Sequence, residues 1–152
     1  MNESVLVVDD DSGVRKVLSS ILSEKGYLVV TVENGKQALK ASEKEYFDVA
    51  LIDIELPDIK GVELLQELKE RQPEMIKIIV TGFPSIDNAM KAINEGAEGY
   101  VLKPFDVEKL LETIRKRLDE KTAEQFRIRM EIEEGSKFQD QFKKPKGSIF
   151  TR

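Results

Sequence analysis

Charged or hydroxyl side chains follow four apolar runs of this 152-residue sequence, each directly after the run ends. They are Asp9 and Asp10 after residues 5–8, Asp53 after residues 49–52, Thr81 after residues 76–80, and Lys103 after residues 99–102. Burying an unpaired carboxylate costs stability. Asp53 must therefore lie just past a strand end, in a polar crevice or beside a cationic group.

Three carboxylates that converge repel one another unless a cation lies among them. The chain has no cysteine and no histidine, so a metal ion would need oxygen ligands, as Mg²⁺ (or Mn²⁺) does. Lys103 would supply a point charge for phosphate oxygens, and the Thr81 hydroxyl would donate to one of them. This set of groups predicts phosphoryl transfer with a carboxylate as the nucleophile.

Each of these signals alone has a plainer explanation. Residues 9–11 (DDD) suit the N-terminal cap of a helix, and Asp53 suits a turn. Thr81 is ordinary at a strand end, and Lys103 before Pro104 suits a solvated loop. The coincidence of all four at the ends of apolar runs favours a shared site.

The apolar runs alternate with segments of helical periodicity. Strands are predicted at residues 5–8, 27–32, 48–52, 76–80 and 99–102, and helices at residues 12–25, 35–44, 60–71, 84–95 and from Asp106 onward. Five strand–helix repeats predict right-handed crossovers and one parallel sheet with helices on both faces. The fold class is α/β, a flavodoxin-like three-layer (βα)5 doubly wound sheet of strand order 2-1-3-4-5. We expect the more polar second strand at an edge and the other four in the centre. The polar residues after strands 1, 3, 4 and 5 then meet at one edge.

The last helix is predicted to continue beyond the domain. Its inward stripe is followed by the polar stretch 119–125, and apolar residues resume at Phe126 and Met130 before Gly135. We expect a domain at residues 1–120, a helical extension at 121–134, and a basic, flexible tail at 135–152. The tail carries a net charge of +4. Because the whole chain carries −5, residues 1–134 carry −9.

Composition and charge exclude several classes of protein. No apolar run approaches the ~18 residues of a transmembrane helix, and no signal peptide is recognisable, so we expect no membrane association and a cytoplasmic location. The acidic body makes nucleic-acid binding by the domain improbable. The basic tail is more typical of a solvated segment than of a nucleic-acid or membrane contact.

Residues 7–11 (VVDDD), 51–61 (LIDIELPDIKG), 80–82 (VTG) and 99–105 (GYVLKPF) resemble the receiver domain of two-component response regulators of the chemotaxis-regulator type. The resemblance covers residues 4 to about 118. It implies that Asp53 accepts a phosphoryl group from a phosphohistidine of a sensor histidine kinase. It also implies that Asp10 ligates Mg²⁺ directly, Asp9 partly through water, Asp53 by its side chain, and Glu55 by its backbone carbonyl.

The same resemblance implies a switch. Lys103 would bind the phosphoryl group, with a cis peptide bond to Pro104. Thr81 would move to donate to the phosphate, and Tyr100 would swing inward, whereas its plainer interpretation is an exposed edge tyrosine. The surface of helix 4, strand 5 and helix 5 would change shape, and a partner would recognise it there.

The output of such a switch stays open at this point. The extended last helix would mediate homodimerisation or partner binding, as would the surface of helix 4, strand 5 and helix 5. Alternatively, the chain is a receiver-plus-linker fragment of a larger transcriptional regulator or ATPase activator, or a monomeric phosphate shuttle or sink. About 30 residues after the domain cannot form a helix-turn-helix domain with its own core.

A flavin- or nucleotide-binding protein would need a Gly- or Ser/Thr-rich loop in place of residues 9–11. An aspartyl phosphatase would have its nucleophile after strand 1.

Overall fold

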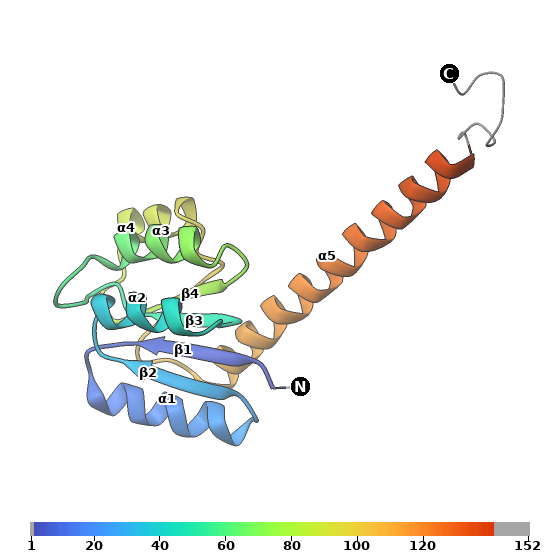
Figure 1. Cartoon of the computed structure of the whole chain (residues 1–152). Coiled ribbons are helices and arrows are strands. Elements are labelled where there is room, and N and C mark those ends of the chain that lie inside the picture. Colours follow the sequence, from blue (N-terminus) through green and yellow to red (C-terminus); the bar gives the residue numbers. More distant parts are fainter. Residues whose placement is uncertain (1, 142–152) are drawn as a thin grey trace. The chain divides into compact units, whose positions relative to one another are not determined.

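A computed structural model describes residues 2–141 of the chain (Figure 1). Five strands alternate with five helices: β1 (Ser4–Val8), α1 (Ser12–Glu24), β2 (Leu28–Val32), α2 (Gly35–Lys44), β3 (Val49–Ile52), α3 (Gly61–Arg71), β4 (Ile76–Thr81), α4 (Ile86–Asn94), β5 (Gly99–Leu102) and α5 (Val107–Gln141). The alternation predicted from apolar runs and helical periodicity is confirmed.

All neighbouring strands are parallel, and the sheet has the order β2-β1-β3-β4-β5, as predicted. Its register pairs Val8 with Ile52 and Ile52 with Ile79. The carboxyl ends of β1, β3 and β4 therefore lie beside one another. Any side chain that directly follows these strands is brought to the same edge of the sheet.

The placement of β5 corrects one expectation. The predicted strand order already places strand 5 at an edge, and β5 indeed pairs only with β4. The separate expectation of a central strand, drawn from its apolar composition, is wrong, because its residues are half-buried or exposed. Helices that cover the two faces of a sheet favour apolar residues in an edge strand as well, so composition does not report on the edge. The apolar interpretation of β4 also missed Lys77, which is buried and donates from Nζ to the Met75 carbonyl at 2.9 Å.

Alternating strand residues face two cores. Leu6 and Val8 of β1 pack with buried residues of α2, α3 and α4. Val5 and Val7 point to the opposite face, which α1 covers with Leu18 and Leu22. Figure 1 shows α2, α3 and α4 on one side of the sheet and α1 on the other. The two cores hold the sheet rigidly, so the loops at its carboxyl edge are well positioned.

Helix α5 divides between two compact units, of which the first ends at residue 117 and the second begins at residue 118. In the first unit, α5 buries Leu110 and Ile114. In the second unit the helix continues through Gly135, where we expected it to end, as far as Gln141. A glycine lowers helix stability by only ~1 kcal/mol and does not by itself end a helix. The flexible-tail prediction for residues 142–152 lies outside the described residues.

Within residues 2–141, no helix is both long and apolar enough to cross a membrane.

Candidate functional site

Asp53 lies directly after β3 and is buried. Its backbone N–H donates to the Val8 carbonyl at 2.9 Å, which extends the pairing of β3 with β1 by one residue. Its Oδ1 accepts a hydrogen bond from the Glu55 N–H at 3.0 Å, while its Oδ2 accepts from Lys103. The carboxylate is therefore compensated by hydrogen bonds and by a cation, which explains how the strand end tolerates it.

Lys103 joins two carboxylates across the sheet edge. Its Nζ lies 2.8 Å from Asp53 Oδ2 and 2.7 Å from Asp9 Oδ2. Burial lowers the pKa of Lys103, but the hydrogen bonds and negative charges of Asp53 and Asp9 outweigh this effect and raise it. The lysine is therefore cationic at neutral pH. Its peptide bond to Pro104 is cis, as expected.

Asp9 and Asp10 complete an acidic cluster with Asp53. One oxygen from each carboxylate lies within 4.8 Å of the others, with Asp9 and Asp53 buried and Asp10 exposed. Burial raises the pKa of Asp9, and its hydrogen bond with Lys103 offsets only part of the effect. A divalent cation would relieve this cost, and carboxylate oxygens are ligands that Mg²⁺ prefers. The cluster therefore fits a divalent cation.

The structure separates the helix cap from this cluster. Asp11 is the N-terminal cap of α1, and its Oδ1 accepts from Gly13 N at 2.8 Å and Val14 N at 3.1 Å. Asp9 instead accepts from the Asp11 N–H through Oδ1 at 2.9 Å. The capping interpretation of residues 9–11 therefore applies to Asp11 alone, so it does not occupy Asp9 or Asp10.

Thr81 ends β4 at the same edge and is fully buried. Its Oγ1 accepts from the Phe83 N–H at 3.1 Å, and its carbonyl accepts from the Lys103 N–H at 2.8 Å. Tyr100 is half-buried and packs against the core of the α2–α4 face, and its hydroxyl is buried without a hydrogen-bond partner. Tyr100 is therefore not the exposed edge tyrosine of the plainer interpretation.

Two residues near the site were not singled out from the sequence. Arg15 donates from Nη1 to the Asp9 carbonyl at 2.7 Å. Asp58 accepts from the N–H groups of Gly35 and Lys36, both at 2.9 Å. Arg15 carries no local signal, because its partner is a backbone carbonyl. Asp58 had one, since it follows Pro57 in a loop and Asp is a frequent capping residue, but its helix lies 22 residues earlier in the chain.

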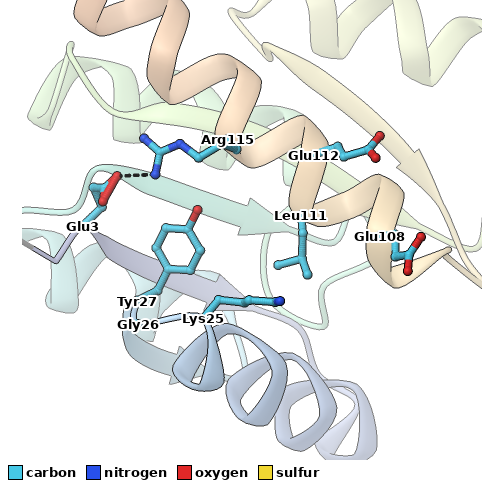
Figure 2. A pocket seen from close by; sticks show the side chains of 8 residues that line it. All are labelled: Glu3, Lys25, Gly26, Tyr27, Glu108, Leu111, Glu112 and Arg115. Atoms are coloured by element: carbon cyan, nitrogen blue, oxygen red, sulfur yellow. Dashed lines mark hydrogen bonds and ion pairs between the residues drawn. The ribbon is translucent and has the colours of Figure 1, made fainter.

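A separate pocket of about 430 Å³ lies near the amino ends of β1 and β2, at the end of the sheet opposite to Asp53 (Figure 2). It is lined by Glu3, Lys25, Gly26, Tyr27, Glu108, Leu111, Glu112 and Arg115. Arg115 Nη1 is paired with Glu3 Oε2 at 2.9 Å. Glu3 precedes β1 and Tyr27 precedes β2, so the pocket lies at the amino ends of these strands, away from Asp53.

Comparison with known proteins supports the sequence resemblance. The family "Response regulator receiver domain" matches residues 5–115. The sporulation initiation phosphotransferase F of Bacillus subtilis is 33% identical over 118 residues, covering 78% of this chain and 95% of that protein. The DNA-binding transcriptional regulator NtrC of Proteus hauseri is 40% identical over 113 residues, covering 74% of this chain and 24% of that protein. The chain thus spans only about a quarter of the length of several curated relatives.

Solved structures agree with these matches. A CheY-like receiver domain from Methanospirillum hungatei has a TM-score of 0.80 at 39% identity and covers 82% of this chain and 99% of its own. The beryllofluoride-activated NtrC4 receiver domain dimer has a TM-score of 0.74 at 39% identity, and the match covers 78% of this chain and 98% of that one. A Burkholderia pseudomallei response regulator with a phosphorylated aspartic acid, calcium ion and citrate has a TM-score of 0.72 at 31% identity. The match covers 82% of this chain and 73% of that one. With its five-stranded parallel sheet and its carboxyl-edge acids, the chain belongs to the receiver domain family of two-component response regulators, a family of phosphoacceptor signalling modules.

Proposed function

We propose that Asp53 accepts a phosphoryl group from a phosphohistidine of a sensor histidine kinase. One observation carries the proposal: Lys103 Nζ contacts both Asp53 and Asp9 at the edge where the strands end. In the transfer, an Asp53 carboxylate oxygen attacks phosphorus, a P–O bond forms and the P–N bond breaks. The imidazole leaves with the electron pair and binds a proton. Lys103 is already beside Asp53 and can bind the transferred oxygens.

The acidic cluster would hold Mg²⁺ (or Mn²⁺) during this reaction. Asp9, Asp10 and Asp53 would contribute carboxylate oxygens, and Glu55 its backbone carbonyl. The cation would neutralise the charge that the phosphoryl oxygens bring to the cluster. The solved relative from Burkholderia pseudomallei, with a phosphorylated aspartic acid and a calcium ion, supports this assignment.

The phosphoryl group would change the contacts of Thr81 and Tyr100. The Thr81 hydroxyl now accepts from Phe83 N–H, and its own hydrogen is able to donate to a phosphoryl oxygen. A shift of the β4–α4 loop toward Asp53 would alter the packing around Tyr100, whose hydroxyl lacks a partner. The response would then reach the surface of α4, β5 and α5.

That surface already exposes apolar side chains suited to a protein partner. Ile86, Met90 and Ile93 follow one another at helical spacing on α4, and Ile86 is 80% exposed. The partner would be a second copy or a downstream protein, at this surface or on the extended part of α5. The NtrC4 receiver dimer among the solved relatives supports a second copy.

The match to a quarter of longer regulators supports a further possibility. The chain would then be the receiver and linker of a transcriptional regulator or ATPase activator. We propose a receiver at residues 1–120 and a helical linker that begins at residue 121 and continues into the basic segment as far as Gln141. A cytoplasmic location would follow from phosphotransfer with a kinase.

The experiment that tests the proposal compares the wild-type chain with Asp53→Asn. Incubation with a small phosphodonor and Mg²⁺ should add one phosphate to the wild type, as measured by intact mass spectrometry. The substituted asparagine keeps the size of the side chain but lacks a nucleophilic carboxylate, so we expect complete loss of the phosphate. Labelling at the wild-type level in the variant would place the phosphoacceptor elsewhere.

A further inference from the structure

The loop that follows Asp53 is anchored to the start of a distant helix. Asp58 Oδ1 accepts from Gly35 N–H and Asp58 Oδ2 from Lys36 N–H, both at 2.9 Å. Both N–H groups belong to the first turn of α2, where backbone donors lack partners within the helix. One carboxylate therefore ties the loop between β3 and α3 to α2.

The neighbouring Ile59 makes a second contact with the same place. A Cβ atom on Gly35 would lie 1.9 Å from Ile59 Cγ2, so only glycine at position 35 lets the isoleucine approach this closely. Ile59 is half-buried and packs against the core of the α2–α4 face. We call Asp58 and Ile59, with their contacts to Gly35 and Lys36, the loop latch.

The other end of the loop is closed on Asp53 itself. The Gly61 N–H donates to the Ile54 carbonyl at 3.1 Å, and a Cβ on Gly61 would lie 2.6 Å from Ile54 Cα. Glu55 N–H meanwhile donates to Asp53 Oδ1 at 3.0 Å. The loop therefore has a fixed base at Ile54 and Gly61 and a tip held by the latch, with Glu55 between them.

A second side chain also caps α2. Helix α2 already has an N-terminal cap, because Asn34 Oδ1 accepts from Gln37 N–H at 2.8 Å. The segment before α2 also reaches the other side of the acidic cluster: Glu33 lies 3.8 Å from Arg15, which donates to the Asp9 carbonyl at 2.7 Å. The segment before α2 is thus linked to Asp9 through Arg15 of α1, while the first turn of α2 holds the loop that follows Asp53.

We propose that Asp58 is a positioning residue of the phosphorylation site, which holds the loop so that Glu55 and Asp53 face the metal position together. The inference rests on the proposed function. Residues that orient metal ligands without touching the metal typically change affinity by ~10–100-fold when removed. Asp58 would act in this way through the loop backbone.

The charge state of Asp58 is consistent with this role. Its slight burial raises the pKa, but the hydrogen bonds from Lys36 and Gly35 outweigh that effect and lower it below 3.8. The Asp58 carboxylate is therefore fully charged near neutral pH. Its contribution to stability is present above pH 3.8 and is lost as the pH falls through the lowered pKa.

The test compares Asp58→Ala with the matched control Asn34→Ala in the full chain. Each variant removes one cap from α2, so both should lower the melting temperature. Only Asp58→Ala should weaken Mg²⁺ binding, by about tenfold in titration calorimetry, because only Asp58 holds the loop. Phosphate incorporation should slow in the same variant, at Mg²⁺ concentrations that saturate the wild type.

Several outcomes would overturn the inference. Wild-type Mg²⁺ affinity in both variants, or an equal loss in both, would show that Asp58 only caps the helix, and would leave the proposed function intact. If wild type itself binds neither Mg²⁺ nor phosphate, the proposed function fails and the inference with it. Should Asp58→Ala not fold, Asp58→Asn keeps the shape and one acceptor oxygen, and it should still weaken Mg²⁺ binding relative to Asn34→Ala.

Discussion

Within residues 2–141, the ion pairs around Lys103 and those around Arg127 lie in different settings. At the sheet edge, Lys103 bridges Asp9 and Asp53 at 2.7 and 2.8 Å, and the Asp9 side chain is only 3% exposed. In the second unit, Arg127 bridges Glu124 and Glu131 along one face of α5, at 2.9 Å to Glu131, and its side chain is 59% exposed. Each network places one cation between two carboxylates.

The difference lies in what replaces a lost partner. Water solvates the carboxylates of Glu124 and Glu131 as soon as Arg127 leaves, so the exposed pairs contribute little. Asp9 and Asp53 have little access to water, and removal of Lys103 leaves two buried negative charges together. Similar geometry therefore supports a functional site in one region and only a solvated helix face in the other.

Of the substitutions that test this contrast, Lys103→Ala should cause the largest loss of stability. Without Mg²⁺, the variant should lose about 3–5 kcal/mol of unfolding free energy at pH 7, since two buried carboxylates lose their cation. Chemical denaturation measures this loss, and added Mg²⁺ should recover part of it. Metal affinity should stay nearly intact, while the phosphate-driven conformational change should disappear, as amide exchange in the β4–α4 loop would report.

The pH dependence supplies the control for this variant. The Lys103 pKa is raised in the folded protein, so its stabilisation is complete below 10.5 and is lost as the pH rises through the raised value. The gap between wild type and Lys103→Ala should therefore be constant near neutral pH and should shrink above pH 10.5, as the lysine loses its proton. A large loss of Mg²⁺ affinity in Lys103→Ala would contradict the assignment.

An intermediate effect is expected from truncation after Leu118. The acidic cluster is complete within one chain, whereas the second unit exposes Phe126, Ile128, Met130 and Ile132. If a second copy covers these side chains, the full chain is a dimer and the truncated chain a monomer by light scattering. A dimeric mass that persists after truncation would place the interface on α4, β5 and α5 instead.

The smallest effect is expected from Arg127→Ala. Alanine is a better helix former than arginine, and the two glutamates are solvated once the arginine is gone. The melting temperature of the full chain should not change measurably in differential scanning calorimetry. A clear decrease would mean that the Arg127 network is buried in an assembly, which would remove the contrast with Lys103.

The local parts of the fold could be predicted because they depend on neighbouring residues. Apolar runs and helical periodicity predicted all ten elements, and short connections between parallel strands leave few topologies. Two expectations were wrong, at positions where the local sequence pattern carries no information on the tertiary structure. The apolar composition of β5 did not report its edge position, and Gly135 did not end α5.

By itself, the sequence determined the strand–helix alternation, the strand order and the residues that follow each strand, since these depend on periodicity and on the handedness of crossovers. Only the tertiary structure decided which groups touch. Lys103 meets residues 94 and 50 positions away, and Asp58 meets a helix 22 positions earlier, because sheet register and loop path bring them together. Those contacts have no local signature, and they are what turns a set of strand-end residues into a site.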